Sequence, residues 1–444
     1  MFSRMRWLRS SVVLFPVIIG MIFGLAGSAG AVDEKTLERM EQVIKQQQAQ
    51  IEAQAQALEK LQQQVDALSE SAVKEATEAA KAEVAKSAVP PDVVRAKGGE
   101  KVSVQIYGQV NRAFLAADDG DSSDYYFVDN DNSSTRVGVL GEAKVNDDIT
   151  VGTRMEFEYQ SNASNLVNQE DKNPDGTSFD DRWVDAQLTS KRFGKFYLGK
   201  GSTASDGTSE VDLSGTDVVG YSSIADMAGG ILFYDKTTGT RSNTNVGDAF
   251  SNFDGLGRRN RFRYDSPEFW GFKLSTSLLS DGGDVALKYA AKWGEDWKFA
   301  AAAAYANPRA TDDDTDNIYN GSASVLHSSG FNLTVAGGVE DLASGLLNPD
   351  GTIRDDDPIF YYGKLGYRKQ WFEFGETRLS VDYQYVKDLD QDGDKAKTFG
   401  FQVVQDLPEW GSEYYLGYRW HELDRDLADF DDINALMTGV RVKF

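Results

Sequence analysis

The chain has 444 residues, a formal net charge of −24 and no cysteine. Its 24 Phe, 19 Tyr and 8 Trp are too many for a disordered chain, and its acidity does not suit nucleic acid, whose phosphates bind basic surfaces. Without cysteine there is no disulfide or thiol nucleophile, and His327 and His421 are the only histidines. The single long apolar run stands at the N-terminus, which excludes a protein built from several membrane-spanning helices.

Residues 1–31 have the pattern of a secretory signal peptide. Three arginines precede an apolar stretch from Val12 to Leu25, and the small residues Ala29 and Ala31 follow it. A basic start, an apolar middle and small residues at positions −3 and −1 predict cleavage after Ala31. A retained N-terminal anchor helix is the alternative. We expect an exported protein.

Residues 32–88 are predicted to form a coiled coil. They are rich in Gln, Glu, Ala, Lys and Leu, and apolar residues recur in a seven-residue repeat. Such a repeat predicts helices that wind around one another, because a lone polar helix would leave its apolar stripe unburied. The expected core residues are Leu37, Ile44, Ile51, Leu58, Leu61, Val65 and Leu68. A monomeric amphipathic helix on a surface is the alternative, and the number of helices stays open.

A linker is expected at residues 89–100. Pro90 and Pro91 end a helix, because proline lacks the backbone donor and clashes with the preceding turn. Gly98 and Gly99 then supply a flexible joint. The next domain therefore comprises residues 101–444.

This C-terminal domain has the alternating pattern of β-strands. In its first run, Val104 and Ile106 interleave with Ser103 and Gln105. Each run has about the 9–11 residues that a tilted membrane strand requires. Sixteen runs are expected, approximately at residues 102–111, 134–145, 149–160, 181–190, 193–200, 258–265, 272–280, 283–293, 297–306, 319–328, 331–341, 358–369, 376–387, 396–406, 412–422 and 435–444.

The connections between these runs alternate in length. Those after odd-numbered runs are mostly long and acidic, and the longest is 201–257, whereas those after even-numbered runs are tight turns such as 191–192 and 329–330. This alternation predicts an up-and-down barrel whose two rims face different compartments. The expected fold class is all-β, a 16-stranded antiparallel transmembrane β-barrel preceded by an α-helical coiled-coil segment.

Within the barrel, polar side chains are expected inside and apolar side chains outside. In run 149–160, Val151 and Met155 share one face, whereas Arg154 and Glu156 share the other. A charged strand face that is not a loop points into water, and the apolar face then points into lipid.

Several segments resemble the general diffusion porins of Gram-negative outer membranes. The similar segments are 104–109 with its Tyr-Gly pair, 135–142, 181–183, 193–200 and the strand-turn-strand 263–272. The terminal Phe444 matches the residue that the barrel-assembly machinery reads in this family. The resemblance covers residues 101–444 and implies an outer-membrane homotrimer in which each protomer has a water-filled pore.

The coil before the barrel resembles the periplasmic extensions of some sugar-specific porins and of porins that tether the outer membrane. We therefore expect residues 32–88 in the periplasm. One departure from the family concerns Asp185 and Gln187, which share the predicted outward face of Trp183, where the family has apolar residues. Either they lie in a trimer contact or the alternation slips by one residue.

The connection 201–257 is expected to narrow the pore, because in the resembled family the loop at this place folds inward. Its candidate constriction acids are Asp206, Glu210, Asp212, Asp217 and Asp226. The expected pore-lining arginines are Arg136 and Arg182 from the resemblance, and Arg154, Arg259, Arg261 and Arg263 from alternation. Facing rows of opposite charge would create a transverse field that sorts solutes by size and charge. For the acids, an ordinary solvated surface is the alternative.

No catalytic residue, resident cofactor or metal is expected. Residues 388–394 resemble the start of a calcium loop, but Phe399 stands where the bidentate glutamate belongs. Calcium that bridges the acidic loops to lipopolysaccharide is the hypothesis left open. An enzyme is not favoured, because the chain has two histidines and no G-x-S-x-G motif.

The expected function is passive diffusion of ions and small hydrophilic solutes, with mild cation selectivity from the acidic mouth. The alternatives are a structural tether of the outer membrane to the cell wall through the coil, and a substrate-specific sugar channel. The expected partners are further copies of the chain, outer-membrane lipid and lipopolysaccharide, small solutes, and peptidoglycan or a periplasmic protein at the coil. Nucleic acid is not expected.

Overall fold

The computed structural model describes residues 102–174, 178–309 and 314–444. The predicted signal peptide, coiled coil and linker lie outside the described residues. No helix within the described ranges is long and apolar enough to cross a membrane.

The described chain is built from β-strands with short helical turns between some of them. The strands are β1 (Val102–Asp118), β2 (Ser123–Asp129), β3 (Arg136–Lys144), β4 (Ile149–Gln160), β5 (Ser178–Ser190), β6 (Gly194–Ser202), β7 (Leu232–Asp235), β8 (Thr240–Asn245), β9 (Arg258–Asp265), β10 (Phe272–Leu278), β11 (Gly283–Trp293), β12 (Trp297–Asn307), β13 (Thr315–His327), β14 (Phe331–Leu342), β15 (Ile359–Phe372), β16 (Gly375–Lys387), β17 (Lys395–Leu407), β18 (Ser412–Asp424) and β19 (Ile433–Lys443). The helical turns are η1 (Asp131–Ser133), η2 (Ile224–Asp226), α3 (Val246–Ala249) and η3 (Pro408–Trp410).

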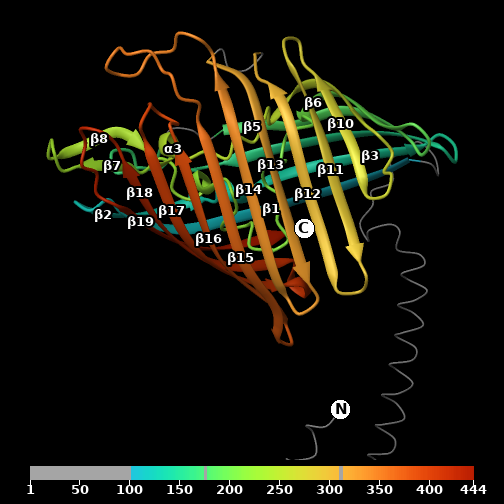
Figure 1. The fold of residues 1–444 in the computed structure, drawn as a ribbon. Coiled ribbons are helices and arrows are strands. Elements are labelled where there is room, and N and C mark those ends of the chain that lie inside the picture. The colour runs from blue at the N-terminus through green and yellow to red at the C-terminus, as the bar shows by residue number, and fades with distance from the viewer. Residues whose placement is uncertain (1–101, 175–177, 310–313) are drawn as a thin grey trace, which may run out of the picture. The chain divides into compact units, whose positions relative to one another are not determined.

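The strands close into an antiparallel barrel (Figure 1). Each strand pairs with the next one around the wall, β6 pairs with β9, and β19 pairs with β1. β2 and β3 pair with successive parts of β1, so the 17 strands of the main sheet occupy sixteen positions. The predicted 16-stranded barrel is confirmed, and each of the sixteen sequence runs overlaps one wall strand.

Two features of the wall differ from the sequence prediction. β1 extends to Asp118, beyond the expected end of the first run, and β2 lies in the expected connection between the first run and the second, 134–145. The reason is a tight turn at residues 119–122, which returns the chain along β1 before β3 begins. Apart from this hairpin, the long connections follow odd-numbered runs, as the sequence predicts, and the tight turns form the other rim.

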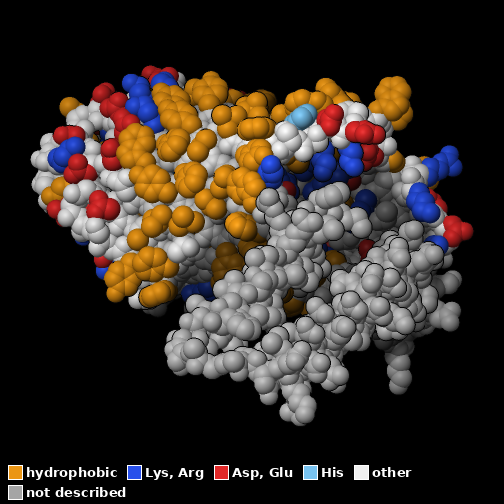
Figure 2. Space-filling view, turned by 90° about the horizontal axis from the view of Figure 1, so that it is seen from below, with side chains coloured by type: hydrophobic (Ala, Val, Ile, Leu, Met, Phe, Trp, Pro, Cys, Tyr) orange, Lys and Arg blue, Asp and Glu red, His pale blue; other side chains and the backbone are white. Residues whose placement is uncertain are grey.

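Side chains alternate between the outside and the lumen along each wall strand. On β14, Phe331, Leu333 and Val335 are exposed, whereas Asn332 and Thr334 are buried. Figure 2 shows exposed apolar side chains gathered over a broad area of the surface. This arrangement inverts the polarity of a water-soluble β protein, and it suits a barrel with lipid outside and water inside.

A β-bulge in β5 settles the phase of this strand. The register with β4 passes over Arg182, so that Arg182 and Trp183 both lie on the lumen side. Beyond the bulge, Val184 is exposed on the outer face and Asp185 is buried on the inner face. Gln187 donates to Asp185 at 2.9 Å. The alternation therefore slips by one residue, and Asp185 and Gln187 do not belong to an outward contact.

Residues 203–257, which we call the inner loop, fold back into the barrel. The inner loop contains η2, the hairpin of β7 and β8, and α3. Its buried Phe233 and Phe250 belong to one apolar cluster with Ile433 and Met437 of the wall. The apolar core of the described chain thus lies inside the barrel, between the inner loop and the wall.

The wall has a seam between β2 and β3. Residues 130–135 leave the sheet there and carry η1 towards the inner loop, where Asn130 donates to the carbonyl of Val218 at 2.7 Å. Arg112 of β1 spans the seam. Its guanidinium donates to the carbonyl and the hydroxyl of Ser161, both at 2.9 Å, and lies 3.4 Å from Asp129.

Candidate functional site

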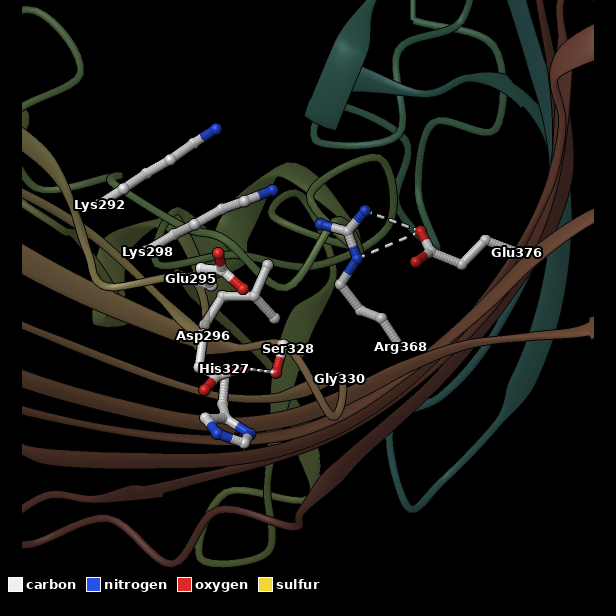
Figure 3. A pocket seen from close by; sticks show the side chains of 10 residues that line it. Lys292, Glu295, Asp296, Lys298, His327, Ser328, Gly330, Arg368 and Glu376 are labelled. Carbon is white, nitrogen blue, oxygen red and sulfur yellow. Dashed lines mark hydrogen bonds and ion pairs between the residues drawn. The ribbon is translucent and has the colours of Figure 1, made fainter.

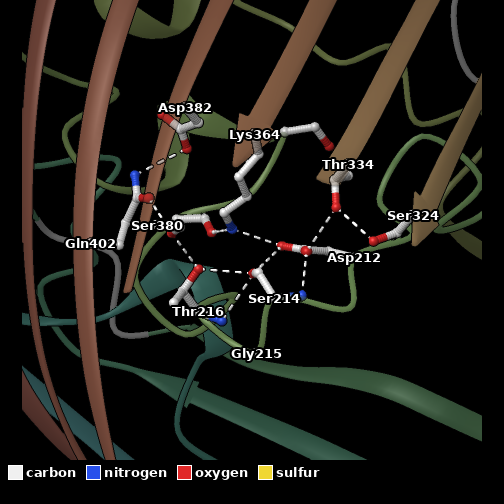
Figure 4. A network of polar contacts seen from close by, with 12 residues as sticks. Asp212, Ser214, Gly215, Thr216, Ser324, Thr334, Lys364, Ser380, Asp382 and Gln402 are labelled. Carbon is white, nitrogen blue, oxygen red and sulfur yellow. Dashed lines mark hydrogen bonds and ion pairs between the residues drawn. The ribbon is translucent and has the colours of Figure 1, made fainter. Parts of the chain in front are cut away.

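Buried polar contacts hold the middle of the inner loop against the wall (Figure 4). Asp212 accepts from the Lys364 ammonium of β15 at 2.7 Å and from the Thr334 hydroxyl of β14 at 3.1 Å. The Thr216 and Ser380 hydroxyls lie 2.7 Å apart and join the loop to β16. Because three neighbouring strands share these contacts, the path of the loop across the lumen is well defined.

The start of the inner loop is fastened to β11 and β13. The Ser205 amide and hydroxyl donate to Asp284 at 2.8 and 2.6 Å. The Ser322 hydroxyl donates to the carbonyl of Thr208 at 2.7 Å and accepts from the amide of Val211 at 2.9 Å. Small hydroxyl residues on the inner wall therefore serve as partners for the loop backbone.

The return of the inner loop packs against the wall through aromatic rings. The Phe250 ring lies 5.3 Å from the ring of His421 on β18, and the Phe253 ring lies 5.3 Å from the ring of Phe360 on β15. All four side chains are buried. The loop therefore covers the inner face of the wall from β11 to β18, and the open space lies on the opposite side, along β3, β5 and β9.

This open space is a cavity of about 520 Å³, which we call the charged cavity. Its wall residues include Arg136, Arg182 and Arg258. Facing them are six carboxylates, Asp206, Glu210, Asp217, Asp226 and Asp254 of the inner loop and Asp131 of η1. Arg258 and Asp206 approach to 4.0 Å. Opposite charges thus face one another across the cavity, and carboxylates outnumber guanidinium groups.

Glu156 of β4 organises the arginines of the wall. Its side chain is buried, and its carboxylate lies 2.6 Å from Arg154, 2.9 Å from Arg182 and 3.9 Å from Arg136. The Tyr107 hydroxyl donates to it at 2.6 Å. Charge-assisted hydrogen bonds fix the planes of the guanidinium groups. Glu158 also pairs with Arg182, so two carboxylates stand among three arginines and leave this part of the wall positive.

The loop carboxyls are close to one another and shielded from water. Burial, together with the charge of Asp131, raises the pKa of Asp226 to about 7. Burial and the charge of Asp206 raise the pKa of Asp254 to about 7. Burial and the charge of Asp254 raise the pKa of Glu210. The negative charge of the inner loop therefore increases as the pH rises through neutrality.

Two of the predicted arginines face inward but are buried in the wall. Arg261 lies 2.9 Å from Asp185, and neither side chain is exposed. Arg263 lies 2.7 Å from Asp265. Each arginine is covered because a carboxylate stands next to it on the inner face of the sheet. They do not line the charged cavity.

Three further predicted residues also lie outside the charged cavity. Asp212 is engaged by Lys364 at the docking contact of the inner loop. Arg154 lies 4.0 Å over the ring of Trp183 and reaches the site only through Glu156. Arg259 is exposed and donates to the carbonyl of Arg258 at 3.2 Å. The structure thus brings Arg136, Arg182 and four of the five predicted acids together.

The sequence prediction omits Arg258, Asp254 and Asp131, which all line the cavity. Alternation counted from Arg261 predicts that Arg258 points outward. Arg258 is the first residue of β9, however, and Gly257 before it has a φ of +59°, which redirects the chain. Asp254 lies within the connection predicted to narrow the pore, so its residue type could have identified it. For Asp131 no sequence pattern indicates that the chain leaves the wall.

The acidic segment 388–394 is engaged by arginines. Arg425 lies 2.5 Å from Asp390 and 2.5 Å from Asp394, and Arg354 lies 3.5 Å from Asp392. Within the described ranges, no group of three or more His, Cys, Asp or Glu side chains is placed to hold a metal ion. Guanidinium groups therefore neutralise the carboxylates that suggested a calcium loop.

The terminal Phe444 extends the pairing of β19 with β1. Its amide donates to the carbonyl of Gly108 at 3.0 Å, and its carbonyl accepts from the amide of Gly108 at 2.9 Å. A Cβ at Gly108 would lie 2.6 Å from the Phe444 ring, so a residue without a side chain is needed there. Phe444 as a whole is 67% exposed, at the rim of tight turns.

Comparison with known proteins identifies the family. A sequence profile described as Gram-negative porin matches residues 71–426. The solved structure of a loop L8 deletion mutant of OmpT from Vibrio cholerae is 15% identical, with 78% of this chain and 100% of that chain covered and a TM-score of 0.51. Outer-membrane expressed OmpT of Vibrio cholerae is 14% identical, with coverage of 80% and 100% and a TM-score of 0.50. No curated protein matches the chain. At these identities the two structures show a shared fold.

Proposed function

The chain belongs to the Gram-negative porin family and is a transmembrane β-barrel of the outer membrane, and we propose that it forms a water-filled channel for ions and small hydrophilic solutes. The charged cavity carries this proposal, because it is a polar space between the inner loop and the wall of the barrel. Passage requires no chemistry, and the residues that line the narrow part act only through its size and charge.

We further propose that the channel is mildly cation-selective. Six carboxylates and three guanidinium groups line the cavity. In a narrow path with walls of low dielectric constant, the field of fixed charges is focused and concentrates ions of opposite sign. The excess of carboxylates supports a preference for cations, and salt weakens this preference because it screens the fixed charges.

Conductance of the purified protein in planar lipid bilayers tests the proposal. We expect stepwise openings, and in a salt gradient a reversal potential of the sign that cations produce. A folded barrel that never conducts would contradict the channel, and a reversal potential of the opposite sign would contradict the cation preference alone. Competition by added saccharides would identify a sugar-specific channel.

We also propose that the protein is a homotrimer with a periplasmic coil. The heptad repeat of residues 32–88 supports association, because its apolar stripe requires a partner helix. Native mass spectrometry of the full chain tests the trimer. Deletion of residues 33–88 distinguishes the channel role from a tether role. If the outer membrane detaches from the cell wall while its permeability is unchanged, the coil has the tether role.

Divalent cations at the outer loops remain a separate proposal. Asp355, Asp356 and Asp357 are exposed in one long connection, where calcium could bridge them to lipopolysaccharide. Calcium titration against the mobility of a probe in this connection tests it, and an unchanged mobility would end it.

A further inference from the structure

Four lysines stand opposite one another on three neighbouring strands. Lys273 of β10 pairs with Lys288 of β11, and Lys292 of β11 pairs with Lys298 of β12. Directly opposed residues in an antiparallel pair have Cβ atoms about 4.5–5.5 Å apart, and like charges at such positions destabilise the sheet. These two lysine pairs therefore destabilise this part of the wall unless negative charge offsets their repulsion. We call these residues the lysine cluster.

The lysine cluster faces the lumen. Lys273 shares its face with the buried Ser275, whereas Leu274 between them is 48% exposed on the outside. Figure 3 shows Lys292 and Lys298 extending side by side from the wall. With Arg368 they line a cavity of about 310 Å³ beside the tight turn between β11 and β12.

The described part of the chain places no carboxylate within 4.0 Å of any ammonium of the cluster. Glu295, Asp296 and Glu376 line the same cavity, but none of them forms a salt bridge with Lys292 or Lys298. Asp296 accepts from the Ser328 hydroxyl at 2.6 Å, and Glu376 lies 2.7 Å from Arg368. The charge of the lysines is therefore not balanced by salt bridges within the described wall.

The contact made by Lys288 supports the same conclusion. Its ammonium donates to the carbonyl of Asp206 in the inner loop at 3.4 Å, and it forms no salt bridge with a carboxylate of the described residues. The arginines of the charged cavity differ in this respect, because Glu156 and the loop acids face them. Within the described wall, four lysines without a salt bridge thus come together on β10, β11 and β12.

We propose that the lysine cluster binds multiply charged oxyanions such as inorganic phosphates in the lumen. An ammonium group is a compact charge on a flexible stem and suits phosphate oxygens without a fixed orientation. In the cavity, a polyanion relieves the repulsion between Lys292 and Lys298, whereas a monovalent anion can neutralise only one of these two charges. The site is distinct from the charged cavity and deepens the proposed channel function, on which its physiological role rests.

The position of the lysine cluster near one rim makes its access to anions different from the two sides of the membrane. An anion that enters from the rim of tight turns meets Lys292 and Lys298 beside the turn between β11 and β12. An anion from the other rim must first pass the carboxylates of the charged cavity. We therefore expect a bound polyanion to obstruct the current when it is added on one side of the membrane and not on the other.

Inorganic tripolyphosphate is the probe for this site. In planar bilayers, we expect it to reduce the conductance from one side, and K292Q/K298Q to require at least a tenfold higher concentration for the same reduction. The matched control is K443Q, because Lys443 lies at the same rim but pairs with Glu413 at 2.9 Å. Equal reduction in K292Q/K298Q and the unaltered protein would overturn the site.

Calorimetry on the folded protein in detergent separates this inference from the channel proposal. Tripolyphosphate should bind the unaltered protein and K443Q alike, and K292Q/K298Q at least tenfold more weakly. If it binds in this pattern to a protein that never conducts, the channel proposal fails and the lysine site stands. If it does not bind, or binds all three proteins equally, the lysine site is wrong whatever the conductance.

Discussion

Asp212 of the inner loop and Lys364 of β15 form an ion pair with 2.7 Å between carboxylate and ammonium. The lysine side chain is completely buried and that of the aspartate is 5% exposed. Lys364 also donates to the carbonyl of Gly220 at 2.7 Å. One wall residue therefore holds two points of the inner loop on the side of the lumen opposite Arg136 and Arg182.

Replacing Lys364 with methionine should loosen the inner loop. The change leaves Asp212 buried without its partner, and removal of one member of a buried ion pair costs about 3–5 kcal/mol. Single-channel records of K364M should show noisier current. The double variant D212N/K364M should be less noisy. K397M is the control, because Lys397 pairs with Glu422 at a partly exposed position. Quiet K364M channels would mean that the pair does not hold the loop.

Replacing Glu156 with glutamine should shift selectivity towards anions. The carboxylate compensates Arg136, Arg154 and Arg182, and its loss increases the positive charge of the wall by one unit. The reversal potential of E156Q in a salt gradient measures the shift. E422Q, which removes a carboxylate paired with Lys397, should leave the potential unchanged. The same potential in E156Q and the unaltered protein would place this arginine group away from the ion path.

Cation selectivity should increase as the pH rises from about 6 to about 8. The pKa values of Asp226 and Asp254 are raised to about 7, so both carboxyls are mostly neutral at the lower pH and charged at the higher one. Reversal potentials across this range test the expectation. D226N/D254N should flatten the profile, whereas D350N should not, because hydrogen bonds lower the pKa of exposed Asp350. A flat profile in the unaltered protein would contradict the assignment.

Loss of the Asp185 carboxylate should destabilise the wall. Asp185 and Arg261 are both without exposed side-chain surface, so D185N leaves a buried guanidinium uncompensated, at about 3–5 kcal/mol. D185L/R261M should recover much of this stability, since neither charge remains. The temperature at which the barrel unfolds in detergent measures both. D147N is the control, because exposed Asp147 pairs with Lys144 and such pairs contribute about 0–1 kcal/mol.

Much of the barrel could be predicted from the sequence because a strand with one face in lipid and one in water has a strict period of two. The same rule fails wherever one residue is inserted. At Arg182 a bulge moves every later side chain of β5 to the other face, and nothing in its residue types marks the insertion. The hairpin of β1 and β2 was not predicted, because its turn lies inside a long acidic connection.

The charged cavity was predictable only in part. Residue type and alternation indicate that Arg136 and Arg261 face inward, but not which one meets a carboxylate on the adjacent strand. Asp185 covers Arg261 because the register of β5 with β6 and of β6 with β9 brings them together. The path of the inner loop depends on contacts far apart in the sequence, such as Asp212 with Lys364.

The seam between β2 and β3 makes the strength of the barrel wall uneven. Elsewhere neighbouring strands are joined by backbone hydrogen bonds, which do not depend on ionic strength. At the seam, backbone hydrogen bonds join Asp129 only to Asn162 and Ser164, and contacts of the Arg112 guanidinium with Ser161 and Asp129 add to them. We expect loss of this one side chain to weaken the wall there, and high salt to screen its ion pair with Asp129. Under a sideways load, the barrel would begin to open at this seam rather than along β1, which is paired on both sides.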